Sequence, residues 1–457
     1  MQLFNRYVSP RGLTVFGCEI LLIFGSVAIA ARAHGAGPDV ARDMWKIALI
    51  TGLCQLCFYY NDLYDLTVVH SSRELLIRLL QAAGAASILV ALLYLLIPSI
   101  AIGNGIFVSS LVIFLIAIIA WRLLFNRLAY ASQLEERVLI VGTGTTARML
   151  ARQIQSQHDF GYRVVGFIDD APALGQGALS PATLGAAEDI PQIVRQYDVD
   201  RIVVGLSDRR GRLPISELLQ AKLSGVRVED ATTTYERLTG KILIDDLKPS
   251  WLIFSDGFAI SRWSRLLKRL IDLALASIGF VLAAPLTLLT ALAVYLDSDG
   301  PILYRQERVG ESGHVFTLFK FRSMRVDAEK AGQPIWAKEN DERVTRVGRF
   351  IRKARLDELP QLWNVLRGDM SFVGPRPERP YFVQQLAEEI PFYQQRHAVK
   401  PGVTGWAQIK YQYGSSIEDA MEKLRYDLYY IKHLSIALDL SIVFDTVKVI
   451  MFGKGAK

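Results

Sequence analysis

Two neighbouring carboxylates and an arginine framed by prolines lie in one short segment, LDELPQLWNVLRGDMSFVGPRP, at positions 356–377. Asp357 and Glu358 precede a proline, and Arg376 stands between two prolines near the end. Carboxylates beside a basic run suit phosphate chemistry with a metal, because carboxylates bind or replace the cation and arginines hold phosphate oxygens in forked hydrogen bonds. The basic run just before the dyad is Arg346, Arg349, Arg352, Lys353 and Arg355.

This segment resembles the catalytic core of the bacterial polyprenyl-phosphate sugar-phosphate transferases, also called monotopic phosphoglycosyl transferases. The resemblance continues upstream in PILYRQERVGESGHVFTLFKFRSM, at 301–324, and downstream in KPGVTGWAQI, at 400–409. It covers the chain from about Arg262 to the C-terminus, and several motifs in the right order make it specific. The hydrophobic front half also resembles the long-form members of that family.

The resemblance implies a mechanism with a covalent intermediate. A carboxylate can attack phosphorus and form an acyl phosphate, and the family motif gives this role to Asp357. It would attack the sugar-linked phosphate of a UDP-sugar and expel UMP, and undecaprenyl phosphate would then take the hexose 1-phosphate and so initiate an exopolysaccharide or similar glycan. Glu358 would assist as a metal or proton partner. The implied cofactor is Mg²⁺, held by Asp357, Glu358 and Asp427, the last at a family position in LRYDLYYI.

Four cations are candidates for binding substrate phosphate. The backbone of Arg376 is pre-set by its flanking prolines, and Arg352 is the basic residue nearest the dyad that matches the family motif. Lys320 and Arg322 lie in FKFRSM, where a predicted strand turns its phenylalanines inward and leaves both cations on the other face. That face either binds substrate or is simply exposed. For Asp427 the alternative to a site role is a surface ion pair on a helix.

Composition indicates a membrane protein rather than a nucleic-acid-binding one. Hydrophobic residues make up 51% of the 457 residues, the net charge is +7, and the basic residues flank apolar stretches. Anionic lipid and a diphosphate substrate explain this charge better than nucleic acid does. Four apolar segments, at 13–31, 45–60, 75–97 and 106–125, predict an N-terminal transmembrane helix bundle at 1–136. On balance, loop charges place both of its ends in the cytoplasm, although the loop after the first segment argues the other way.

Alternating strands and helices predict a Rossmann-like α/β domain at 137–239. Its glycine turn at 142–147, GTGTTA, resembles a dinucleotide fingerprint, and Asp169 or Asp170 follows the next strand where a ribose ligand could lie. The favoured interpretation is a relic of a nucleotide-binding fold, in which the glycines only permit a tight turn. A connector at 240–261 then leads to a mostly helical catalytic domain at 262–457.

The apolar stretch at 270–296 is long enough to span a bilayer, and Pro285 lies near its middle. A proline within a helix removes one backbone hydrogen bond and favours a kink. The α/β domain before this helix and its nucleotide sugar are expected in the cytoplasm. A helix that turns back at Pro285 keeps the dyad on that side, and the family resemblance implies the same re-entrant hairpin. The alternative is a straight fifth transmembrane helix.

The sequence thus predicts a multi-pass enzyme of the bacterial inner membrane with its catalytic domain on the cytoplasmic face. Its expected partners are a UDP-sugar, undecaprenyl phosphate and membrane lipids, with a homodimer left open. One alternative is an NAD-dependent enzyme that modifies nucleotide sugars on the α/β domain, although no complete fingerprint or catalytic Tyr–Lys pair is found. The other is a membrane scaffold without catalytic activity.

Overall fold

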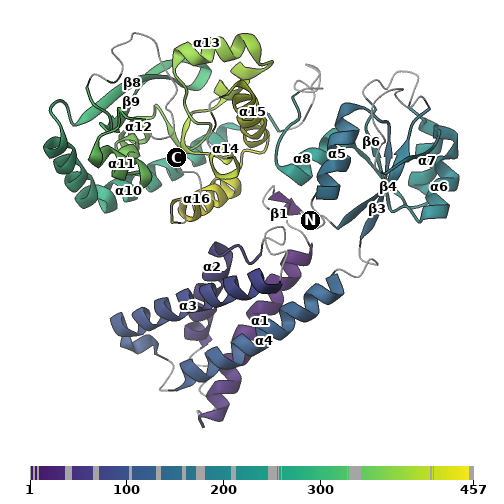
Figure 1. The fold of residues 1–457 in the computed structure, drawn as a ribbon, viewed down its shortest axis with the longest axis horizontal. Coiled ribbons are helices and arrows are strands. Elements are labelled where there is room, and N and C mark those ends of the chain that lie inside the picture. Colours follow the sequence, from purple (N-terminus) through teal and green to yellow (C-terminus); the bar gives the residue numbers. More distant parts are fainter. Residues whose placement is uncertain are drawn as a thin grey trace. The chain divides into compact units, whose positions relative to one another are not determined.

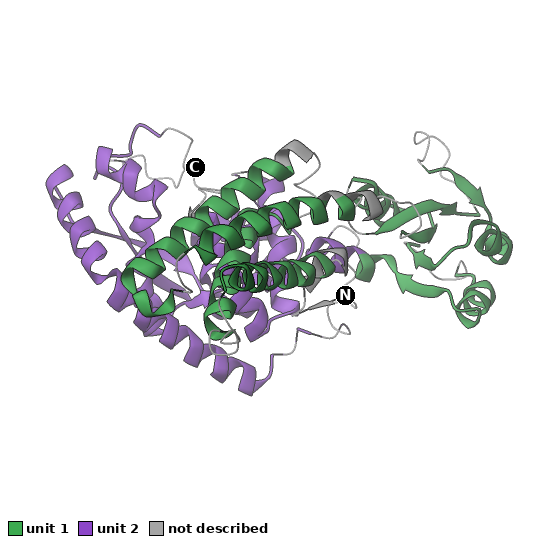
Figure 2. Ribbon diagram, turned by 90° about the horizontal axis from the view of Figure 1, so that it is seen from below, with its two compact units in different colours: residues 1, 7–234 green, residues 2–6, 235–457 purple. Residues whose placement is uncertain are grey.

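The protein is described here by a computed structural model. The described residues are 2–3, 6–7, 10–35, 44–64, 72–101, 105–129, 135–156, 161–170, 181–206, 213–244, 255, 257–258, 260–326, 328, 341–411, 414 and 416–451. They fall into two compact units, which Figure 2 distinguishes by colour. The first comprises residues 1 and 7–234, and the second comprises residues 2–6 and 235–457.

The front of the first unit is helical, as its apolar segments predict. Helix α1 packs against α2 and α4, and α2 packs against α3. A buried ion pair between Glu19 and Arg122, with N–O distance 2.7 Å, joins α1 to α4. Within the described residues, Thr14–Ala33 and Leu75–Leu96 are long and apolar enough to cross a bilayer, whereas α2 and the apolar part of α4 are shorter. The helices are α1 (Pro10–Ala33), α2 (Met44–Tyr60), α3 (Ser72–Leu96) and α4 (Ile106–Ala129).

The rest of the first unit contains the predicted parallel sheet, in the strand order β5-β4-β3-β6-β7. Figure 1 shows α5 on one side of this sheet and α6 and α7 on the other. Strand β3 lies at the centre, and its apolar residues 138–141 are fully buried. The strands are β3 (Glu136–Val141), β4 (Tyr162–Ile168), β5 (Thr183–Gly185), β6 (Arg201–Val204) and β7 (Arg227–Asp230). The helices are α5 (Thr145–Ser156), α6 (Ile190–Tyr197), α7 (Ile215–Leu223) and α8 (Ala231–Thr239).

The second unit is mostly helical, as predicted, and the catalytic part, 235–457, contains the strand pairs β8–β9 and β10–β11. Strands β8 and β9 form an antiparallel hairpin, and β10 pairs in parallel with β11. The strands are β8 (Leu303–Val309), β9 (Val315–Phe321), β10 (Ser371–Val373) and β11 (Gly402–Thr404). The helices are α10 (Arg262–Asp297), α11 (Arg346–Lys353), α12 (Gln361–Arg367), α13 (Pro380–Glu389), α14 (Trp406–Lys410), α15 (Ile417–Lys432) and α16 (Ile436–Met451). Two 3₁₀ segments, η7 (Leu356–Glu358) and η8 (Tyr393–Ala398), complete the site region.

The core of the second unit begins earlier in the chain than the predicted domain boundary at 262. Ile242 and Ile244 are buried in it together with residues of α13, α15 and α16. The indole of Trp406 donates to the carbonyl of Gly240 at 2.7 Å, and the Ile242 amide donates to the Arg425 carbonyl at 3.0 Å. The first residues of the expected connector at 240–261 are therefore part of the catalytic unit.

Helix α10 continues through Pro285 without interruption. The predicted kink at this proline therefore does not divide α10 into two separate helices. Both of its ends are anchored to the same unit. Near the start, the buried carboxylate of Asp272 accepts from the Phe372 amide at 2.9 Å, and after its end the Ser298 carbonyl accepts from Arg322 at 2.5 Å. The stretch between these anchors exposes a row of large apolar side chains: Ile278, Phe280, Val281, Leu282, Leu286, Leu288, Leu289 and Leu292.

Candidate active site

The dyad lies in the tight turn η7, directly after helix α11. Arg355, which precedes η7, has a left-handed backbone (φ 58°) that ends the helix and redirects the chain. The side chains of successive residues in a 3₁₀ helix point about 120° apart, because this helix has three residues per turn. Asp357 and Glu358 are therefore neighbours in sequence whose side chains have different surroundings.

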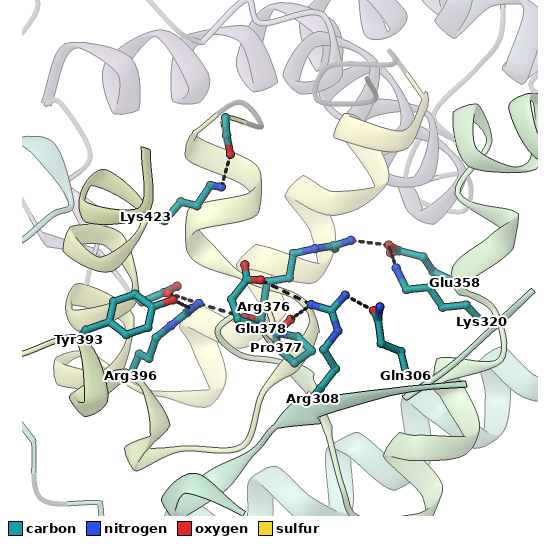
Figure 3. A network of polar contacts seen from close by, with 12 residues as sticks. Gln306, Arg308, Lys320, Glu358, Arg376, Pro377, Glu378, Tyr393, Arg396 and Lys423 are labelled. Atoms are coloured by element: carbon teal, nitrogen blue, oxygen red, sulfur yellow. Dashed lines mark hydrogen bonds and ion pairs between the residues drawn. The ribbon is translucent and has the colours of Figure 1, made fainter. Parts of the chain in front are cut away.

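Glu358 is held by cations from two other elements. Its Oε1 atom accepts from Arg376 Nη2 at 2.6 Å and from Lys320 Nζ at 3.1 Å, and the three side chains meet in Figure 3. Arg355 Nη1 lies 4.0 Å from the other carboxylate oxygen. The side chain of Glu358 is only 11% exposed. This largely covered carboxylate fixes two of the predicted phosphate-binding cations, Arg376 and Lys320, in place.

Asp357 differs from its neighbour because its carboxylate has no hydrogen bond or ion pair to any residue that the structure describes. The residue is 8% exposed, and Lys320, Arg352 and Arg376 act on it through their charges. Arg352 is fixed in turn, because its Nε donates to Ser323 Oγ at 2.9 Å. An attack on a phosphate requires a nucleophile with available lone pairs and positive charge that holds the phosphate. A buried carboxylate without hydrogen bonds to the described residues, placed among cations, meets both requirements.

Burial and neighbouring charges shift the pKa values of the two carboxylates of the dyad in opposite directions. Burial raises the pKa of Asp357, the charge of Glu358 raises it further, and Lys320 opposes both. Burial alone would raise the pKa of Glu358, but Arg376 and Lys320 outweigh it and hold that pKa below its usual range. Burial likewise lowers the pKa of Lys320, and Glu358 partly restores it. Glu358 is thus the fixed anion and Asp357 the more basic carboxylate, as a nucleophile should be.

The donor set of the dyad fits a magnesium ion only in part. Among the described residues no group of three or more His, Cys, Asp or Glu side chains could hold a metal. Mg²⁺ needs only one or two carboxylates when substrate phosphates and waters complete its shell, so Asp357 and the Oε2 atom of Glu358 fit. Asp427, the third predicted ligand, does not fit, because it is buried and accepts from Arg396 Nη2 at 2.9 Å.

The structure separates Lys320 from Arg322, which the sequence analysis placed on one strand face. Strand β9 ends at Phe321, so the alternation of faces no longer applies at Arg322. Lys320 reaches Glu358, whereas Arg322 donates to the carbonyl and hydroxyl of Ser298 at 2.5 and 3.1 Å. Arg322 thus binds the residue that follows the C-terminal end of α10 and is not part of the cation group around the dyad.

Arg376 projects from a loop that β10 and β11 hold in place. The Gly374 amide donates to the Thr404 carbonyl, and the Gly402 amide donates to the Pro375 carbonyl, both at 2.9 Å. A Cβ atom on Gly402 would lie 2.1 Å from the Gly374 nitrogen, so only glycine permits this approach. Sequence reasoning missed two further arginines at this loop, Arg308 and Arg396, because no local pattern connects them to it.

The α/β domain has a cavity of about 130 Å³ at the carboxyl ends of its strands, but the glycine turn beside it is already engaged. Asp169 accepts from the backbone amide of Thr143 at 2.9 Å and also from its hydroxyl. In dinucleotide-binding proteins the amides at this turn face the pyrophosphate. An internal carboxylate takes one of them here, which weakens the NAD-dependent alternative. The cavity is lined by Val141, Ile168, Asp169, Asp170, Ala187, Leu206 and Pro214.

Two family models match the chain. Residues 263–453 match "Bacterial sugar transferase", and residues 60–220 match "CoA-binding domain". The first match contains the dyad and every cation of the candidate active site.

Three similar proteins share long aligned stretches. The UDP-N-acetylgalactosamine-undecaprenyl-phosphate N-acetylgalactosaminephosphotransferase of Aeromonas hydrophila is 43% identical over 52% of this chain. The undecaprenyl-phosphate glucose phosphotransferase of Komagataeibacter xylinus is 36% identical over 71% of this chain. The UDP-glucose:undecaprenyl-phosphate glucose-1-phosphate transferase of Klebsiella pneumoniae is 34% identical over 71% of this chain. The matched stretches span 56%, 60% and 69% of these relatives' own lengths.

Proposed function

The chain belongs to the bacterial sugar transferase family, and on this premise we propose that it transfers a hexose 1-phosphate from a UDP-sugar to undecaprenyl phosphate. The observation that carries the proposal is the contrast within the dyad. Glu358 is bound to Arg376 and Lys320, whereas Asp357 has no partner among the described residues and lies amid the same positive charges. The names of the relatives add the two substrate classes.

In the first step, a carboxylate oxygen of Asp357 attacks the phosphorus that carries the sugar. The bond between this phosphorus and the oxygen bridging to the second phosphate breaks, and UMP leaves with the bond's electron pair. The product on the enzyme is an aspartyl phosphosugar. Arg376 and Lys320, both fixed by Glu358, supply positive charge to the phosphate oxygens during this displacement.

In the second step, a phosphate oxygen of undecaprenyl phosphate attacks the same phosphorus. The bond from Asp357 to phosphorus breaks, the free carboxylate returns, and the sugar leaves as a diphosphate of the lipid. Splitting one transfer into two displacements requires that the nucleophile be a good leaving group, and a carboxylate satisfies this requirement.

Asp357 and Glu358 would hold the Mg²⁺ ion that we propose as cofactor. When bound, the ion would neutralise part of the charge on the diphosphate and on the leaving UMP. The protein side chains bind and orient the phosphates in either step, and the low exposure of both carboxylates limits attack by water.

The membrane arrangement is the second part of the proposal. Helices α1–α4 form a transmembrane bundle with both ends in the cytoplasm, and α10 enters and leaves the bilayer on the cytoplasmic side. The anchors at Asp272 and Ser298 support the second statement, because both ends of α10 contact one folded unit. A spanning helix would place one of these ends on the far side of the membrane.

A panel of UDP-sugars tests the reaction, with the full-length protein in detergent, undecaprenyl phosphate and magnesium. UDP-glucose and UDP-N-acetylgalactosamine come first, because the relatives' names include both sugars. We expect UMP release from one sugar and a matching lipid-linked product. No UMP from any sugar with the lipid present would contradict the proposal, and glycan output unchanged in cells by Asp357→Asn would favour the scaffold.

The order of events tests the covalent step separately. Because UMP leaves before the lipid acceptor binds, a two-substrate analysis should give parallel lines, and one equivalent of UMP should appear without any acceptor. Mass spectrometry should find the phosphosugar on the peptide that contains Asp357. Intersecting lines, together with no UMP before acceptor is added, would replace the two-step mechanism with a direct transfer.

A further inference from the structure

The loop that carries Arg376, residues 375–378, is held in place by hydrogen bonds to its main-chain carbonyl groups. Two of its four residues, at 375 and 377, are prolines and have no amide hydrogen to donate. All four consecutive carbonyls from 375 to 378 accept a hydrogen bond from outside the loop. The donors are the Gly402 amide to Pro375 at 2.9 Å, Arg396 Nη2 to Arg376 at 3.0 Å, Arg308 Nη1 to Pro377 at 2.9 Å and the Val309 amide to Glu378 at 2.9 Å.

Two of these four donors are guanidinium groups, and Figure 3 shows them on either side of the loop. Arg308 extends from strand β8 and also donates to the side chain of Gln306, which helps to aim it. Arg396 lies in η8, is 5% exposed, and bonds to the Tyr393 hydroxyl at 2.7 Å and to Asp427. Each arginine thus has supports of its own and reaches the loop through a main-chain oxygen, and Arg308 Nη1 also lies 3.5 Å from the carboxylate of Glu378.

The loop backbone determines where the Arg376 guanidinium lies. Each proline fixes one φ angle, and Pro377 restricts Arg376 to extended conformations. The loop is therefore stiff, and its remaining freedom is to shift or tilt as a body. The two arginines oppose that movement from two elements, and the Arg376 side chain continues from the held backbone to Glu358 at 2.6 Å.

We propose that Arg308 and Arg396 are positioning residues of the transfer reaction, and that Asp427 supports Arg396. They act through the backbone at 376 and 377, which places the Arg376 guanidinium against Glu358 and beside Asp357. This proposal rests on the proposed function for its kinetic consequences but not for its structural ones. It also gives Asp427 a role in place of metal binding: its carboxylate offsets the charge of a buried guanidinium.

The kinetic test uses the full-length protein and the UDP-sugar that it turns over best. Arg308→Met should lower kcat/KM by roughly tenfold to a hundredfold, the loss expected when a binding group is displaced by about an ångström. Arg308→Lys, which keeps one donor and the charge, should recover part of the loss. The matched control is Arg305→Met, an exposed arginine of the same strand β8, which should stay within about twofold of the parent.

A double-mutant cycle separates positioning from direct substrate binding. If Arg308 acts through Arg376, then Arg308→Met should add almost nothing once Arg376→Ala is present. Two losses that multiply would mean that Arg308 contributes independently, and the proposal would fail. Arg396 is tested as Arg396→Met combined with Asp427→Asn, because removing the cation alone would leave a buried carboxylate without its counter-ion.

Hydrogen exchange gives a readout that does not depend on activity. In Arg308→Met and in the Arg396–Asp427 double variant, the peptide spanning 370–379 should exchange faster, while peptides from α11 and β9, which contain none of the substituted residues, keep the parent rates. Unchanged exchange at 370–379, or equally faster exchange throughout the unit, would overturn the positioning role. If the parent released no UMP from any sugar, the proposed function would fail, and this exchange experiment would still decide the positioning of the loop.

Discussion

At the scale of single residues, the dyad shows how two adjacent carboxylates can have different roles. Asp357 is buried and Glu358 is only slightly more exposed, yet Glu358 has Arg376 and Lys320 as direct partners, and Asp357 has the same cations only as neighbouring charges. The turn of η7 produces this difference, because it directs the two side chains apart. Binding the cations and attacking the phosphate are thereby divided between two residues.

Substitutions in the dyad should therefore differ in kind. Asp357→Asn should lower kcat by roughly a thousandfold or more, because an amide cannot form the acyl phosphate. Glu358→Gln should lower kcat/KM by about a hundredfold, because it leaves Arg376 and Lys320 without their anion but keeps the nucleophile. Single-turnover UMP release measures both. If Asp357→Asn still gave a full burst of UMP, another residue would have to be the nucleophile.

The protonation of His397 should make the catalytic unit sensitive to acid. Burial, and then the charge of Arg396, lower the pKa of His397 from 6.5 to about 4. Below pH 6.5 the unfolded chain takes up a proton at this residue and the folded chain does not, so stability falls as the pH falls from 6.5 toward 4. Between pH 6.5 and 5 the expected loss is about 1.5 kcal/mol.

His397→Gln removes this titration and keeps a polar side chain of similar reach. Thermal unfolding of the parent and the variant at pH 7 and pH 5 compares them, and other titrating groups affect both proteins equally. We expect a smaller drop in Tm for the variant. Equal drops would show that His397 is protonated in the folded protein near its ordinary pKa.

Sequence reasoning located most of the cation group, and its misses have physical reasons. Asp357, Glu358, Lys320 and Arg376 do meet, because motif order and strand alternation describe local geometry well. Arg322 falls one residue beyond the end of β9, where alternation no longer predicts a direction. Asp427 pairs with Arg396, which lies 31 positions away along the chain, and no local pattern reveals such a contact.

At the scale of elements, α10 combines polar anchors at its ends with an exposed apolar middle. The start is tied to β10 through Asp272, and the residue after its end is tied to Arg322. Pro285 lies within this exposed stretch, where a missing backbone hydrogen bond can let the helix bend. The sequence correctly predicted a long apolar helix with an internal proline. It could not predict the anchors, since they depend on residues about 25 and 100 positions away.

Replacing Pro285 should shift α10 toward a straight, membrane-spanning state. Proline costs about 3 kcal/mol in a helix interior, so Pro285→Ala makes the straight helix more favourable by a similar amount. A cysteine at the exposed position Asp299, in an otherwise cysteine-free chain, reports the side of the membrane. The parent should be labelled only from the cytoplasm, and Pro285→Ala should show some labelling from the outside together with lower activity. Outside labelling of the parent would refute the re-entrant arrangement.

At the scale of the whole molecule, the position of the unit boundary decides which fragments are stable. A boundary read from the motifs would start the catalytic fragment near Ser261, but Ile242 and Ile244 are buried in its core. Losing both should cost about 3–6 kcal/mol, at 1.5–3 kcal/mol for each fully buried side chain. That loss is comparable to the whole stability of many domains.

A fragment that starts at Tyr235 should therefore unfold at a clearly higher temperature than one that starts at Ser261, and only the longer fragment should keep activity near that of the full chain. Thermal unfolding and UMP release from matched detergent samples compare the two. Ile242→Ala in the longer fragment is the control, and it should lose about 2–5 kcal/mol. Equal stability of the two fragments would show that the buried residues at 242 and 244 contribute little.

The same core has a consequence for how the protein is made. Ile242 and Ile244 come from its beginning, and Leu438 and Ile442 come from near its end. A ribosome adding 5–20 residues per second needs roughly 10–40 s to pass from one pair to the other. The apolar stretch of α10 emerges early in this time, the other buried residues of the core are made only from Val373 onward, and the core lacks α16 until the end. The catalytic unit should therefore close only after synthesis is nearly complete, and nascent chains stalled before α16 should be degraded by proteases that the released protein resists.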